Sequence, residues 1–325
     1  MTGVLLVGGA SSRFGSPKAL SRLRGETLAA RGHRLLAEVC EEVLVVGKTG
    51  ELDELPFPIL DDGAASRAPV HGVIAGLRQA RNEVSVVLPV DVPLVTPGAL
   101  RALGEAGAVP GRRIPLPGAY PRPLRSVLEE RVAAGELSLR GVNPTTLELP
   151  EELFVDVDTP VRLAELERRR HALVVGGTGM LAPATRALAG RGHVVTSVAR
   201  RAADLSPRVV SAPLDYRDTV ALRTGLARAT EERGPFELAI CWIHTDAPEA
   251  PGVVAAALAP GARLVQVFGT RVWRLERVPL HIAYRSVVLG SSEGRWLTDE
   301  EISAGVLDAV DADRAVHVVG RQVAG

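Results

Sequence analysis

The sequence has 325 residues, and its 38 basic and 38 acidic side chains cancel to a formal net charge of zero. This balance argues against a nucleic-acid partner, which would favour a basic surface. Two cysteines are too few for a disulfide framework, and no apolar run approaches the ~20 residues that cross a bilayer. We therefore expect a cytoplasmic protein with no membrane partner, long enough for two domains.

In the first half, short β-branched runs alternate with stretches of helical periodicity, which is typical of α/β domains with mainly parallel sheets. We expect strands at residues 3–7, 42–46 and 84–90, and helices at residues 26–39, 72–81 and 97–105. Each strand ends where a glycine or an acidic residue begins a loop. Because ligands of such sheets bind beyond the carboxyl ends of the strands, these loops are the first place to look for a site.

The second half restarts the same pattern after a helix expected at residues 161–170. Strands are expected at residues 194–198, 208–212, 237–242, 263–268 and 286–289, with helices at residues 219–232 and 299–312. We therefore predict two Rossmann-like three-layer domains with mainly parallel sheets, at residues 1–168 and 169–325.

A glycine-rich segment, LLVGGASSRFGSPKAL, follows the first strand. Its glycines would let backbone amides approach phosphate oxygens, Arg13 could bridge several of these oxygens, and Lys18 could neutralise the charge that builds up during transfer. The segment lacks the Gly-Lys-Ser/Thr of a Walker loop. The protein is rich in arginine but has only two lysines, Lys18 and Lys48, so the retained Lys18 indicates a place for a compact charge.

Two acidic motifs complete the candidate site. Asp91 ends an apolar strand in LPVDVPLV, where a carboxylate is well placed to hold Mg²⁺. In VDVDTP, Asp156 and Asp158 alternate, so both would project to one side of an extended strand. One of these two aspartates could complete the metal site, and Asp158 or Thr159 could cap the helix that begins at Pro160. The two roles of Asp158 do not exclude each other.

With these motifs in order, residues 1–168 resemble the molybdenum cofactor guanylyltransferases, in the wider family of sugar-phosphate-type nucleotidylyltransferases. The matching segments are LVGGASSRFGSPK, PVHGVIAGL, VDVPL and VDVDTP. The resemblance implies a Mg²⁺-dependent enzyme that transfers GMP from GTP to Mo-molybdopterin and releases pyrophosphate. Pro17 stands where guanylyl enzymes usually have an acidic residue, so CTP remains an alternative nucleotide.

The resemblance also assigns roles to residues. By this resemblance Asp91 would bind Mg²⁺. Asp158 is the second candidate ligand because of its position in VDVDTP. Arg13 of the glycine-rich segment would form the catalytic group together with Lys18 and Asp91. The residues implied to contact the nucleotide are Leu6, Gly8, Gly9, Lys18 and either Asp61 or Asp62.

The second half begins with HALVVGGTGMLAPATRAL, which resembles the glycine turn of short-chain dehydrogenases. Gly176 and Gly179 would place a pyrophosphate at a helix N-terminus. Arg200, followed by Arg201, would suit the 2′-phosphate of NADP, and Asp215 would lie on the adenine side. That family acts through a tyrosine and a lysine four residues later, but this half contains no lysine.

Three functions remain open at this point. The first is a molybdenum cofactor guanylyltransferase with an appended NADP-binding module. The second is a bifunctional cytidylyltransferase and reductase that makes an activated polyol phosphate. In the third, the second half is a non-catalytic sensing or dimerisation module. The sequence does not decide the oligomeric state, and a homo-oligomer is compatible with it.

Overall fold

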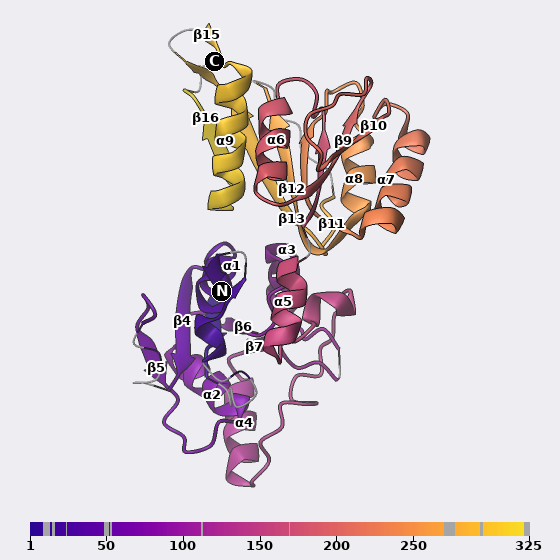
Figure 1. The fold of residues 1–325 in the computed structure, drawn as a ribbon. Helices are drawn as coiled ribbons and strands as arrows, with labels where there is room; N and C mark the ends of the chain where they lie inside the picture. Colours follow the sequence, from indigo (N-terminus) through magenta and orange to yellow (C-terminus); the bar gives the residue numbers. More distant parts are fainter. Residues whose placement is uncertain are drawn as a thin grey trace. The chain divides into compact units, whose positions relative to one another are not determined.

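The computed structural model divides into two compact units, Met1–Arg168 and Arg169–Gly325, which are described separately (Figure 1). It describes all residues except 9–13, 15–16, 24, 49–51, 53, 112, 169, 270–276, 293–294 and 322–325. Among the described residues, no helix has both the length and the apolar character needed to span a membrane.

The first unit is built on a five-stranded sheet with the order β5-β4-β1-β6-β7. All neighbouring strands are parallel except β6 and β7. The strands are β1 (Thr2–Leu6), β4 (Glu42–Gly47), β5 (Ile59–Asp61), β6 (Val84–Pro89) and β7 (Gly118–Pro121). The three strands predicted in this half are present, whereas β5 and β7 were not predicted. Both edge strands are too short to show a clear alternation of apolar and polar residues.

Helices cover both faces of this sheet. They are α1 (Leu28–Ala37), α2 (Pro69–Gln79), α3 (Pro97–Ala106), α4 (Leu124–Ala133) and α5 (Pro160–Arg168). Short elements are the 3₁₀ helices η1 (Lys18–Leu20) and η2 (Glu151–Phe154) and the hairpin of β2 (Arg22–Leu23) and β3 (Glu26–Thr27). We expected a helix from residue 26, but α1 starts at Leu28 because the Thr27 side chain accepts a hydrogen bond from Ala30 N and caps it. Similarly, α2 starts three residues earlier than predicted, with Pro69 in its first turn.

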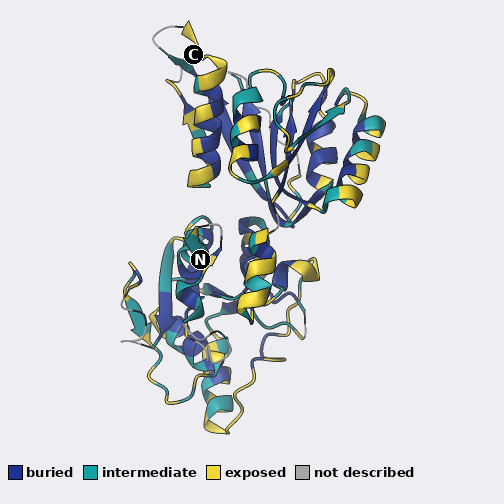
Figure 2. Ribbon diagram, in the orientation of Figure 1, coloured by how far each residue is buried: buried dark blue, intermediate teal, exposed yellow. Residues whose placement is uncertain are grey.

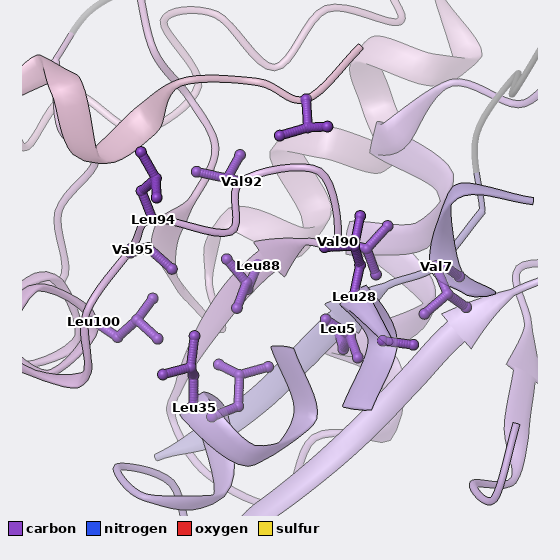
Figure 3. Packing of buried hydrophobic residues seen from close by; sticks show 14 of the residues in the cluster. Leu5, Val7, Leu28, Leu35, Leu88, Val90, Val92, Leu94, Val95 and Leu100 are labelled. Carbon is purple, nitrogen blue, oxygen red and sulfur yellow. The ribbon is translucent and has the colours of Figure 1, made fainter. Parts of the chain in front are cut away.

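The alternation of side chains along β1 divides the core into two layers. Leu5 and Val7 pack on the side of α1 and α3, as Figure 3 shows for Leu5, Leu28, Leu88 and others. Val4 and Leu6 pack on the opposite side, with α2 and α4. This three-layer arrangement fixes the carboxyl ends of β1, β4 and β6 side by side, since Leu6 pairs in register with Val46 and with Pro89.

The second unit contains a seven-stranded, wholly parallel sheet with the order β10-β9-β8-β11-β12-β13-β16. The strands are β8 (His171–Val175), β9 (Val194–Ala199), β10 (Val209–Pro213), β11 (Phe236–Trp242), β12 (Leu258–Phe268), β13 (Ala283–Leu289) and β16 (Val316–Val319). Numbered within the unit, the first six have the order 3-2-1-4-5-6 of a Rossmann fold. The predicted fold class, α/β with mainly parallel sheets, is confirmed for both units.

Helices again lie on both faces of this sheet. They are α6 (Ala182–Gly190), α7 (Thr219–Arg233), α8 (Ala250–Ala256) and α9 (Asp299–Ala312). The cores pack α7 and α8 on one face and α6 and α9 on the other, and Figure 2 shows that the strands between them are largely buried. Helix α9 has the predicted bounds, because Thr298 and Glu301 form a capping box at its start. A two-stranded pair, β14 (Ser291–Ser292) and β15 (Arg295–Trp296), lies outside the sheet.

Candidate functional site

The glycine-rich segment begins where β1 ends. Gly8 is exposed and lies close to Gly47, at the end of β4. A Cβ on Gly47 would stand 2.8 Å from the side chain of Val7 and 3.3 Å from Gly8 N. Gly47 therefore has no room for a side chain, whereas a Cβ on Gly8 would make an ordinary contact with Gly47 at 3.4 Å. The predicted phosphate contacts Gly9 and Arg13 lie outside the described residues.

Lys18, at the end of the same segment, contacts two carboxylates from distant parts of the chain. Its Nζ donates a hydrogen bond to Asp91 Oδ2 at 3.2 Å and to Asp158 Oδ1 at 2.7 Å. Asp91 lies just beyond β6, and Asp158 just before α5. The fold thus brings together three of the residues that the sequence singled out, and the hydrogen bond from Val157 N to Asp91 O, at 2.7 Å, joins the two acidic segments.

The helix cap beside Asp158 is a different residue. Thr159 Oγ1 accepts a hydrogen bond from Arg162 N at 3.2 Å, while Leu163 N donates to the Thr159 carbonyl. Thr159 is therefore the N-terminal cap of α5, and the carboxylate of Asp158 contacts Lys18 instead. We expected the VDVDTP segment to be an extended strand, but it is not part of a strand. It does lie against Asp91, through the hydrogen bond of Val157 N.

Electrostatics mark this cluster as a site of concentrated charge. Burial alone would lower the pKa of Lys18, but the hydrogen bonds and charges of Asp158 and Asp91 outweigh it, so the pKa is raised and the ammonium form persists. Partial burial and the charges of Asp91 and Asp158 raise the pKa of Asp156 to about 6. The charges of both carboxylates therefore act on Asp156 as well.

The second lysine also lies at the carboxyl edge of the sheet. Lys48 directly follows β4, and its Nζ donates hydrogen bonds to Asp62 Oδ1 and to the carbonyl of Ala64. Lys48 has no role among those predicted from the sequence. The sequence did hold a clue to Lys48, since Lys18 and Lys48 are the only lysines in the chain. In the structure, each of them forms an ion pair with an aspartate beyond a strand end.

A pocket lies beside Lys48. Its lining residues are Leu6, Gly8, Val46, Gly47, Lys48, Asp62, Arg67, Ala68, Pro69 and Gly72. Two of the predicted nucleotide contacts, Leu6 and Gly8, thus share one pocket with Asp62.

The structure also distinguishes the two adjacent aspartates that the sequence left open. Asp62 lines the pocket, and its side chain is only 10% exposed. Asp61 is exposed, and its Oδ1 accepts a hydrogen bond from Gly63 N at 2.7 Å. Within the described residues, Asp61 is not part of the pocket.

In the second unit, the glycine turn links β8 to α6. Gly176 has a positive φ of 84°, and a Cβ there would lie 3.2 Å from the carbonyl oxygen of Trp242. A Cβ on Gly179 would meet nothing within 4 Å, so this glycine borders open space. The N-terminus of α6, which follows, has no side-chain cap. Its first amide, Ala182 N, donates to the Gly179 carbonyl at 2.8 Å, and Pro183 has no amide hydrogen to donate.

The other predicted dinucleotide contacts follow β9 and β10. Arg200 is exposed directly after β9. Asp215 Oδ1 accepts hydrogen bonds from Arg217 N at 3.1 Å and Arg217 Nη1 at 3.3 Å, while the same guanidinium contacts Asp246 at 2.9 Å. The backbone hydrogen bond from Arg217 is the largest cause that holds the pKa of Asp215 below its usual value, and the nearby charge of Arg200 adds to it.

Comparison with known proteins gives the family of the first unit. Residues 3–141 match the model of the MobA-like NTP transferase domain. A probable molybdenum cofactor guanylyltransferase of Chloroflexus aggregans is 32% identical over 155 residues, which cover 43% of this chain and 74% of that protein. The chain belongs to the molybdenum cofactor guanylyltransferase family. A second probable guanylyltransferase, from Thermococcus gammatolerans, is 31% identical and is covered over its whole length, against 52% of this chain.

The guanylyltransferase-family match identifies the chain as a nucleotidyltransferase through its first unit. Among solved structures, the molybdopterin-guanine dinucleotide biosynthesis protein A of Archaeoglobus fulgidus is 22% identical with a TM-score of 0.43, and covers 51% of this chain and 97% of its own. A short-chain dehydrogenase from Streptomyces avermitilis is 15% identical with a TM-score of 0.40, and covers 47% of this chain and 89% of its own. The Rossmann fold of the second unit rests on its own strand order.

Proposed function

We propose that the first unit transfers GMP from GTP to Mo-molybdopterin and releases pyrophosphate, with Mg²⁺ as the metal. The observation that carries the proposal is the direct contact of Lys18 with Asp91 and Asp158 at the carboxyl edge of the sheet. Lys18 ends the glycine-rich segment, and the chain belongs to the guanylyltransferase family.

The nucleoside would occupy the pocket lined by Leu6, Lys48 and Asp62. Lys48 and Asp91 lie just beyond β4 and β6, which flank β1 on either side. Two strand spacings separate these positions by roughly 10 Å. An extended nucleoside triphosphate can therefore run across the end of β1, with its base near Asp62 and its phosphates near Lys18.

The donor set at the phosphate end fits Mg²⁺. Within the described residues, no three His, Cys, Asp or Glu side chains form a ready-made metal cage. Mg²⁺ commonly uses only one or two carboxylates and takes its other ligands from phosphates and water. Asp91 and Asp158 would supply the two carboxylates, and the bound ion would withdraw charge from the triphosphate.

In the proposed reaction, an oxygen of the acceptor's terminal phosphate forms a bond to the α-phosphorus of GTP. The bond from the α-phosphorus to the bridging oxygen breaks, and pyrophosphate leaves with the electron pair. The ammonium of Lys18, whose pKa is raised, can stabilise that departing charge. Such a transfer depends on alignment and charge stabilisation rather than on a strong base.

A pyrophosphate-release assay tests this proposal. The full chain would be supplied with Mg²⁺, with GTP or CTP, and with either molybdopterin or a polyol phosphate as acceptor. We expect release with GTP and molybdopterin. Release with CTP and the polyol phosphate alone would favour the second function considered above and contradict the proposal.

For the second unit, we propose an NADP-binding module that does not reduce ketones by the tyrosine-lysine route. The glycine turn before α6, the Rossmann strand order and the exposed Arg200 support dinucleotide binding. The absence of lysine from this half of the sequence argues against the usual catalytic pair. Calorimetry should show tighter binding of NADP than of NAD, and Arg200→Gln should remove the difference. Equal affinities in the unaltered protein would contradict the assignment of Arg200.

A further inference from the structure

Lys18 occupies the position between two carboxylates that the proposed function assigns to a metal ion. Its side chain is 15% exposed, while those of Asp91 and Asp158 are 28% and 55% exposed. Both contacts are ion pairs with hydrogen-bond geometry. In this arrangement one oxygen of each carboxylate is already bonded to a cation.

The backbone holds this arrangement in place. In η1, Leu20 N donates to the carbonyl of Pro17 and Ser21 N to that of Lys18, both at 3.0 Å, and Ala19 is fully buried. On the other side, Val157 N donates to the carbonyl of Asp91 at 2.7 Å. Backbone hydrogen bonds therefore anchor both η1, which carries Lys18, and the two acidic segments.

A divalent cation would meet two obstacles at this site. It would have to displace the ammonium from oxygens of Asp91 and Asp158, and it would then lie close to a positive charge. Hydrogen bonds to charged groups are stronger than neutral ones, so breaking both without replacement is unfavourable. A triphosphate changes this balance, because its oxygens offer the ammonium new acceptors close to the old ones.

We propose that Lys18 excludes free divalent cations from the pair Asp91 and Asp158, so that the metal enters only together with a triphosphate. This inference rests on the proposed magnesium triphosphate site. It gives Lys18 a task before the reaction, in addition to charge stabilisation during it, and it imposes an order in which the metal and the nucleotide arrive as one complex. It also avoids occupation of the site by a metal ion without substrate.

The test measures the affinity of the nucleotide-free full chain for Mn²⁺, by electron paramagnetic resonance of the unbound ion. Lys18→Met, which keeps most of the side-chain length but removes the charge, should bind Mn²⁺ at least about ten-fold more tightly. This is the size of effect that one close charge has on an ionisation equilibrium. Arg78→Met, which removes an exposed cation on α2 outside the site, should bind as the unaltered protein does. Adding Asp91→Asn to Lys18→Met should abolish the gain.

Circular dichroism would establish that each variant is folded, and Lys18→Ala would serve as a second replacement. A further measurement needs no variant: in equilibrium dialysis, the unaltered protein should retain Mn²⁺ with inorganic tripolyphosphate but not without it. Equal Mn²⁺ affinity in Lys18→Met and the unaltered protein, or equal retention with and without tripolyphosphate, would overturn the inference. If the unaltered protein still released pyrophosphate from GTP in that case, the proposed function would stand. If Lys18→Met bound Mn²⁺ more tightly but the unaltered protein released no pyrophosphate, the result would count against the proposed function alone.

Discussion

The ammonium of Lys18 donates a hydrogen bond to the carboxylate of Asp91 at 3.2 Å, across 73 positions of the sequence. The contact joins the segment that follows β1 to the one that follows β6, and these strands are neighbours in the sheet. A triphosphate bound at this edge would therefore meet at once a cation and the carboxylate that we propose as the metal ligand. Four predictions follow from this site and from a buried histidine in the second unit.

Replacing Lys18 with alanine should slow nucleotidyl transfer. Removal of one preorganised electrostatic group commonly costs about 10²-fold in kcat, and the departing pyrophosphate is where charge builds up. Steady-state kinetics of pyrophosphate release would show the effect. If kcat stays the same, Lys18 has no part in the chemical step.

Replacing Asp91 with asparagine should reduce pyrophosphate release below detection and leave the fold intact. The substitution keeps the shape of the side chain but removes the charge that Mg²⁺ requires, while Lys18 keeps Asp158 as a partner. Activity would be measured alongside a thermal melt followed by circular dichroism. Full activity of a folded Asp91→Asn protein with Mg²⁺ would contradict its role as a ligand.

The adjacent aspartates Asp61 and Asp62 form a matched pair for testing the pocket. Asp62→Asn should raise the KM for GTP by about ten-fold, since a hydrogen bond to a charged group contributes roughly 1.5–3 kcal/mol. Asp61→Asn should change the KM by less than about two-fold, as expected of a surface substitution outside the site. A larger effect at Asp61 would place the nucleoside elsewhere.

The stability of the second unit should decrease in mild acid because of His171. This residue is 3% exposed. Its Nδ1 lies 2.7 Å from Gly234 O, and its Nε2 lies 2.9 Å from Thr196 Oγ1. Burial, the largest cause, lowers the pKa of His171 from its usual 6.5. The unfolded chain therefore takes up a proton at a higher pH than the folded protein, and stability is lost as pH falls through 6.5 towards the folded pKa.

Urea unfolding followed by tryptophan fluorescence would measure this effect, because all three tryptophans lie in the second half of the sequence. We expect a lower free energy of unfolding at pH 5 than at pH 7. His171→Gln should be less stable overall but should lose this part of the pH dependence. An identical pH dependence in the two proteins would refute the assignment to His171.

The order of elements was accessible from local patterns. The strands at β1, β4 and β6 alternate or run apolar over five or six residues, and α9 is marked by its capping box. The edge strands β5, β7 and β16 escaped prediction because three or four residues carry too little periodicity. The start of α1 was misplaced because Thr27, rather than Glu26, ends the extended segment and caps the helix.

The sequence by itself determined the residue types of the site and the family to which they belong: a glycine-rich segment, Lys18, Asp91 and the two alternating aspartates. Only the tertiary structure decided which of them meet. It placed Asp158 on Lys18 while Thr159 capped the helix, it put Asp62 rather than Asp61 in the pocket, and it gave Lys48 a place there. The physical reason is that side-chain contacts across 73 or 140 positions depend on the strand order of a parallel sheet, which brings distant carboxyl ends to one edge.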